Sequence, residues 1–216
     1  MIDRPLALGD VVAEAVRIYG ARIWAALGLG AVVGAAFLVV AVTPRGVGIA
    51  AVSLAITLAY AAAARLVSGD RFLEAWAQVG LRLPVLLVLT LIVSLPFAVA
   101  VSYLILLLAG AAWLALVGFS IPVAVLEPGG LAHALRRSLT LARAEYLHAL
   151  GVTAALLVIV LLVGIILAGA LVAFAENERI GAVVLTQVVL SPLFFLGLAV
   201  LYFEQSARAL SSPRRT

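Results

Sequence analysis

Few residues of this chain are of a type that can do chemistry, and they are widely spaced. The chain has no cysteine, and its two histidines, His133 and His148, lie 15 residues apart among charges that are mostly arginine. Disulfides, thiolate metal ligands and cysteine nucleophiles are therefore excluded. No nucleophile with a base, no carboxylate pair and no glycine-rich phosphate loop can be assembled. We expect no enzyme activity, no metal site and no cofactor.

The most basic stretch of the chain is the best candidate for a binding site. Arg136, Arg137 and Arg143 lie within "GGLAHALRRSLTLARAEYLH", residues 129–148. Each basic residue beside an anionic membrane surface is worth about 1 kcal/mol. These three arginines therefore predict a site for anionic lipid headgroups, with membrane lipids as the partner. The alternative is that they only fix the topology of the chain.

Polar residues inside the apolar runs give a second set of candidates. Gln187 is the one amide at the middle of a run, and we expect it either to line a cavity, together with Ser94 and Ser120, or to bond to a neighbouring helix. Coupled carriers place acids or bases near the bilayer centre, and no run has one there. Arg65 and Glu204 lie near the ends of runs, where long side chains reach the interface at little cost.

The composition is that of a membrane protein. Hydrophobic residues make up 66% and charged residues 11% of the 216 residues, against about 25% charged in soluble domains. The net charge of +4 comes from arginine alone, but the arginines stand between apolar runs, so we expect no nucleic-acid binding. Acidic residues in the first 22 positions fit neither a secretory signal nor a transit peptide, so we expect the N-terminus to be retained.

The uncharged runs predict six membrane-spanning helices, since crossing a bilayer takes about 20 apolar residues. Residues 83–126 form one uncharged run of 44 residues, too long for a single span, so we place two spans there with a turn at Ala109-Gly110. The other spans are residues 24–42, 46–64, 149–175 and 180–203.

Two further features of these spans bear on their packing. Kinks are expected at Pro96, Pro122 and Pro192, and Gly30 with Gly34 forms a GxxxG contact face.

The arginines predict the orientation of these spans. With six spans, twelve arginines fall on the side of the termini, and only Arg45 and Arg179 fall on the other side. Positive charge is retained in the cytoplasm. We therefore expect a multi-pass protein of the bacterial cytoplasmic membrane with both termini in the cytoplasm.

The stretch "LGDVVAEAVRIYGAR", residues 8–22, is repeated in pattern. Displacing the chain by 60 places it on residues 68–82, and displacing it by 123 places it on residues 131–145. Each copy has helical periodicity, with Asp10 or Asp70 as a candidate N-cap in the first two, and each precedes an apolar hairpin. The predicted fold is all-α and polytopic: six transmembrane helices as three hairpins, each preceded by an amphipathic interfacial helix, in a pseudo-threefold parallel repeat. The repeat units within this single membrane domain, residues 1–216, are 6–67, 68–126 and 127–207, with a polar tail at 208–216.

Three segments carry a resemblance to a known family. They are "RPLALGDVVAEAVRIYGARIWAALGL" (4–29), "IPVAVLEPGGLAHALRRSLTLARAEYLHALGV" (121–152) and "LYFEQSARA" (201–209). Together they resemble the membrane domain found beside some glycerophosphoryl diester phosphodiesterases. The resemblance implies a six-helix bacterial membrane protein. It carries no hydrolase activity, because the phosphodiesterase domain with its metal ligands has no counterpart here.

These observations predict a non-enzymatic membrane protein that interacts with inner-leaflet lipids, and with a protein partner or a second copy of itself as a scaffold or membrane-shaping element. The alternative is a small carrier or lipid translocator with a groove between the repeats.

Overall fold

The computed structural model describes residues 7–100, 106–174 and 179–211, and within these ranges the chain forms helices and no strands. Residues 176–178, which separate the spans predicted at 149–175 and 180–203, lie outside these ranges, as does the end of the polar tail. The helices are α1 (Leu8–Ala21), α2 (Ile23–Val42), α3 (Arg45–Ser68), α4 (Phe72–Leu81), α5 (Leu83–Ala100), α6 (Leu106–Val117), α7 (Ser120–Leu126), α8 (Leu131–Ala144), α9 (Tyr146–Phe174) and α10 (Arg179–Ser211).

Among the described residues, five helical segments are long and apolar enough to cross a membrane: Ile23–Val42, Arg45–Ser68, Ala109–Leu126, Tyr146–Ala173 and Arg179–Leu210. A sixth is counted if α4 and α5, which are bent by 83° at their junction, are taken as one span. The all-helical, multi-span prediction is confirmed at this level. The turn predicted at Ala109-Gly110 is wrong, because both residues lie inside α6. With no charged residue and no polar loop in that run to mark a turn, the Ala-Gly pair alone was a misleading signal.

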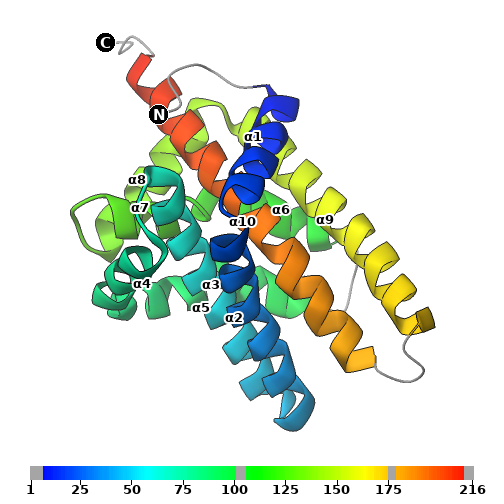
Figure 1. Ribbon diagram of the computed structural model, residues 1–216. Coiled ribbons are helices and arrows are strands. Elements are labelled where there is room, and N and C mark those ends of the chain that lie inside the picture. Colours follow the sequence, from blue (N-terminus) through cyan, green and yellow to red (C-terminus); the bar gives the residue numbers. More distant parts are fainter. Residues whose placement is uncertain (1–6, 101–105, 175–178, 212–216) are drawn as a thin grey trace.

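The last helix, α10, holds the bundle together. It packs against α2, α3 and α9, and also against α1 and α8. The neighbouring spans α2 with α3, α5 with α6, and α9 with α10 also pack in pairs. Figure 1 shows that α1 and the end of α10 lie at one end of the molecule, while the turn between α2 and α3 lies at the opposite end.

The chain changes direction at Arg22, between α1 and α2. The phenol of Tyr19 donates to the carbonyl of Val189 at 3.1 Å, and Gly30 meets the neighbouring carbonyl of Val188. Tyr19 and Gly30 thus contact adjacent residues of α10. Arg22, which lies between the two helices, has a non-helical conformation with φ −130° and ψ 44°.

Pro122 breaks the fourth span into α6 and α7. Proline removes the amide that would bond four residues back and crowds that carbonyl, which here belongs to Gly118, the first residue of the break. The Gly118 carbonyl accepts from the amide of Ile121 at 3.3 Å instead. Two hydroxyls bind neighbouring carbonyls: Ser120 donates to Val117 at 2.6 Å and Ser138 of α8 donates to Leu116 at 2.7 Å. The carbonyls of Leu116, Val117 and Gly118 at the break thus have partners within the protein, as a membrane interior requires.

Gly30 and Gly34 form a contact face, as predicted. A Cβ atom at Gly30 would lie 2.0 Å from the carbonyl oxygen of Val188, and one at Gly34 would lie 2.8 Å from a Val188 methyl. Pro192 lies four residues after Val188 inside α10 and cannot donate to that carbonyl. The glycine therefore lets α2 approach α10 at a carbonyl that proline leaves free.

The predicted N-caps are wrong in position. Asp10 lies in the first turn of α1, where its carboxylate accepts from the amide of Ala7 at 3.1 Å. In α4 the corresponding acceptor is Glu74, which binds the amide of Arg71 at 3.1 Å. Asp70 instead precedes the helix and pairs with Arg65 at 3.4 Å. Both helices thus begin on an acid that reaches back to the backbone, rather than on a capping aspartate.

Candidate functional site

One residue joins each short helix to the long helix that follows it. Arg22 separates α1 from α2, Arg82 separates α4 from α5, and Glu145 separates α8 from α9. These three positions correspond under the displacements of 60 and 123. We call them the joint residues. All three carry a charge at the point where the chain changes direction or leaves the helical conformation.

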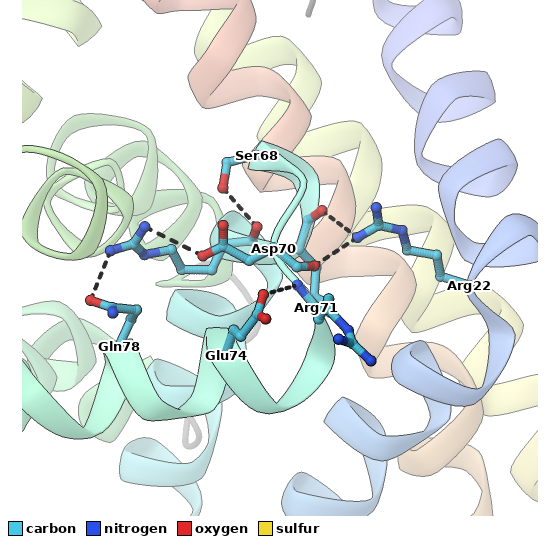
Figure 2. A network of polar contacts seen from close by, with 8 residues as sticks. Arg22, Ser68, Asp70, Arg71, Glu74 and Gln78 are labelled. Carbon is cyan, nitrogen blue, oxygen red and sulfur yellow. Dashed lines mark hydrogen bonds and ion pairs between the residues drawn. The ribbon is translucent and has the colours of Figure 1, made fainter.

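The side chain of Arg22 ties the first joint to the end of α3. Its guanidinium donates to the carbonyl of Leu66 at 2.9 Å and to the carbonyl of Asp70 at 3.0 Å. Figure 2 shows Arg22 reaching across to the segment around Asp70, while Glu74 and Gln78 face the same network from α4. A cation at the last carbonyls of a helix also compensates their partial negative charge.

The other two joint residues make equivalent connections. Arg82 donates to the carbonyl of Gly129 at 3.3 Å, in the loop between α7 and α8. Glu145 forms an ion pair with Arg208 near the end of α10. Gly69 and Gly129, which have positive φ angles of 113° and 153°, lie in the two loops that the arginines bind. Each joint residue therefore contacts the end of the hairpin that follows it.

Glu204 is fully buried, against the expectation that it would reach the interface. Its carboxylate pairs with Arg208, accepts from Gln205 at 3.2 Å and lies 3.6 Å from Nε2 of His148. Burial of a carboxylate is tolerated only with such partners. Arg65 is likewise only 23% exposed and pairs with Asp70 and Gln78. Position near a helix end did not reveal this, because neighbouring helices cover both side chains.

Glu127, directly after α7, forms a third polar cluster. It accepts from Tyr202 at 3.0 Å and from Arg137 at 3.3 Å, and its other oxygen lies 3.1 Å from His133. Burial raises the pKa of Glu127, but the hydrogen bonds from His133, Tyr202 and Arg137 outweigh it and hold that pKa below its ordinary value. The cluster ties α7 to α8 and α10.

The three arginines of the predicted headgroup site divide into two kinds. Arg137 is half-buried in its ion pair with Glu127. Arg136 and Arg143 are exposed, and within the part of the chain that the structure describes neither forms an ion pair. Seven residues apart, they lie on one face of α8, opposite the buried Ala134, Ser138 and Leu141. Two of the three predicted residues thus share an open face.

Large apolar side chains are exposed beside each joint residue. Trp24 is 84% exposed, Leu81 is 74% exposed and Leu147 is 81% exposed. Arginines and exposed apolar groups therefore occur together at this end of the molecule. Tryptophan is enriched at the level where a bilayer meets water.

The residues predicted to line a cavity are not brought together. Ser94 lines an apolar cavity of about 250 Å³ formed mainly by α3, α5 and α10, with one residue each from α6, α7 and α9. Ser120 is buried against the Val117 carbonyl and does not line it. Gln187 is half-buried elsewhere on α10, where its backbone carbonyl accepts from Ser191.

A second cavity, of about 370 Å³, lies between α1, the end of α3 and α10. Its charged groups are Glu14, Arg17 and Arg22, and its apolar groups include Ile18, Leu66 and Phe203. Sequence reasoning missed this pocket. The only sequence signal was the repeated position of Arg22, because nothing local places Phe203 beside α1.

Comparison with protein-family models, with curated proteins and with solved structures gives no match.

Proposed function

We propose that this chain is a non-enzymatic, multi-pass protein of the bacterial cytoplasmic membrane that binds anionic lipids of the inner leaflet. The observation that carries the proposal is the open face of α8. There, Arg136 and Arg143 are exposed without an ion pair in the described structure, while Arg137 is held by Glu127. Two free guanidinium groups on one face suit phosphate groups, which arginine binds well.

We also propose that both termini lie in the cytoplasm and that the chain is built from three similar units. The concentration of arginine at the end that holds α1 and the end of α10 supports a cytoplasmic position for that end. The three joint residues, each bound to the end of its own hairpin, support a unit of one interfacial helix and one hairpin used three times. The resemblance to the phosphodiesterase-associated membrane domain is consistent with this architecture.

The test compares two pairs of arginines. R136Q/R143Q should lower the affinity for phosphatidylglycerol vesicles by about 30-fold, because two charges at about 1 kcal/mol each are removed. R45Q/R179Q is the matched control, since both residues are exposed and lie at the opposite end of α3 and α10. A flotation assay measures the binding of phosphatidylglycerol vesicles to proteoliposomes in which each double variant is oriented. Equal binding by the two double variants would refute the proposal.

A carrier or lipid translocator is the second candidate, and the cavity at Ser94 favours it. The cavity lies near the middle of α3, α5 and α10, where a transported apolar group would pass. Ser94→Phe fills this space and should slow movement of a labelled phospholipid between leaflets of proteoliposomes. Ser120→Ala is the control, because Ser120 does not line the cavity. Unchanged transfer in Ser94→Phe would remove this candidate.

A further inference from the structure

The second cavity combines charges and apolar surface in one partly open pocket. Arg17 and Glu14 enter it from α1, and Arg22 enters it from the first joint. Leu66 of α3 and Phe203 of α10 close its apolar side. A volume of about 370 Å³ falls at the lower end of the roughly 300–1,000 Å³ range of small-molecule sites. The space therefore suits a polar headgroup rather than a whole lipid.

The charges in the cavity leave one positive charge uncompensated. Two guanidinium groups and one carboxylate line it, so its net charge is +1. Glu14 accepts from Arg17 at 2.7 Å, and this hydrogen bond lowers the pKa of Glu14. Arg17 is nevertheless 70% exposed, and Arg22 uses one terminal nitrogen for the carbonyls of Leu66 and Asp70. A ligand with a single negative charge would complete the balance.

The exposed Trp24 supports a position of the cavity near the membrane–water interface. Trp24, two residues after Arg22, is 84% exposed, and exposed tryptophan marks the membrane–water interface. Arg22 and the end of α3 are at the level of this residue. The phosphodiester of a glycerophospholipid carries one negative charge and joins a polar group to an apolar one at this depth.

We propose that the cavity between α1, α3 and α10 binds the phosphodiester of one glycerophospholipid, with Arg17 and Arg22 on the phosphate and Ile18, Leu66 and Phe203 on the adjoining apolar part. This deepens the proposed function by adding a site for a single lipid molecule, separate from the α8 face. Glu14 acts as an internal competitor that limits the affinity.

The experiment uses the full chain in detergent, titrated with short-chain phosphatidylglycerol and followed by native mass spectrometry. R17Q should weaken binding of the first lipid about fivefold, the equivalent of one basic residue. E14Q should strengthen it by a similar factor, because Arg17 is released and the net charge of the cavity rises. A melting curve checks that both variants fold. We expect R17Q to fold, because the Arg17 side chain is 70% exposed.

The outcomes separate this proposal from others. If R17Q and E14Q both bind the first lipid as the parent protein does, the proposal is overturned. Saturable binding of inorganic phosphate alone, lost in R17Q, would overturn the lipid assignment in favour of a free anion. If R136Q/R143Q loses vesicle binding while R17Q leaves the first lipid unchanged, the α8 proposal stands and this one fails. If R17Q weakens binding of the first lipid while R136Q/R143Q keeps vesicle binding, only the α8 proposal fails.

Discussion

The indole N–H of Trp113 in α6 donates to the carbonyl oxygen of Ile92 in α5 at 3.1 Å. Pro96 lies four residues after Ile92 inside α5 and has no amide hydrogen for that carbonyl. The tryptophan therefore satisfies a backbone acceptor that the proline leaves free. This contact also joins the two helices of the second hairpin.

Replacing Trp113 by Phe should lower the free energy of unfolding by about 1–3 kcal/mol, the range for leaving a buried acceptor unpaired. In the Pro96→Ala background the amide of residue 96 can bind Ile92, so the same replacement should cost less. Denaturant unfolding in detergent of the four proteins of this cycle measures the coupling. An identical loss in both backgrounds would show that Trp113 acts through packing alone.

Gly30→Ala should destabilise the protein by about 1–3 kcal/mol, as overpacking does. Its Cβ would meet the rigid carbonyl of Val188 at 2.0 Å, so α2 and α10 would have to separate. Gly151→Ala in α9 is the control, because nothing lies within 4 Å of its Cβ position. Melting temperatures should fall for Gly30→Ala and stay level or rise for Gly151→Ala. A similar change of melting temperature in both variants would argue against the close contact between Gly30 and the Val188 carbonyl.

The absence of cysteine makes the orientation directly measurable. Gly46→Cys in α3 and Ala132→Cys in α8 place single thiols at exposed positions at opposite ends of the molecule. In intact cells an impermeant maleimide should label Gly46→Cys and leave Ala132→Cys unmodified until the membrane is opened. Labelling of Ala132→Cys in intact cells would place α8 outside and exclude an inner-leaflet role.

Acid should weaken the contacts of α7 with α8 and α10 through Glu127. Its pKa is lower in the folded protein than in the unfolded chain, so its stabilising contribution is present above its ordinary pKa of about 4.5. That contribution is lost as the pH falls through the lower folded value. Glu127→Gln should therefore be less stable than the parent at neutral pH, and the difference should shrink below pH 4.5. A constant difference across that range would exclude titration of Glu127 as its source.

The sequence predicted an all-helical chain with several apolar spans, because these depend on local composition and periodicity. Val11 and Ala15 of α1 are fully buried, and α8 begins and ends 123 residues after α1. Gly30 and Gly34 contact another helix as the motif predicts. The turn after α5 was misplaced, because the uncharged run of residues 83–126 holds no charge and no polar loop to mark it.

The charged sites were less predictable, because they depend on distant partners. Neither the burial of Glu204 nor the pairing of Arg137 with Glu127 follows from their own segments. The same holds for the cavity at Arg17, whose walls come from helices about 50 and 190 residues apart in the chain. The arginine clusters in the sequence indicated which end of the molecule carries the candidate sites. Only the packing shows which arginines are held in ion pairs and which are exposed.

The position of α10 has a consequence for synthesis. Ribosomes deliver the chain from its N-terminus, so α2 and α3 are made long before the helix that packs against both. Until α10 emerges, the glycine face of α2 and the Tyr19 hydroxyl of α1 lack the contacts that they make with α10 in the folded protein. We expect early intermediates to rest on lipid or on an insertion factor at these surfaces, and the final helix to displace it when translation ends.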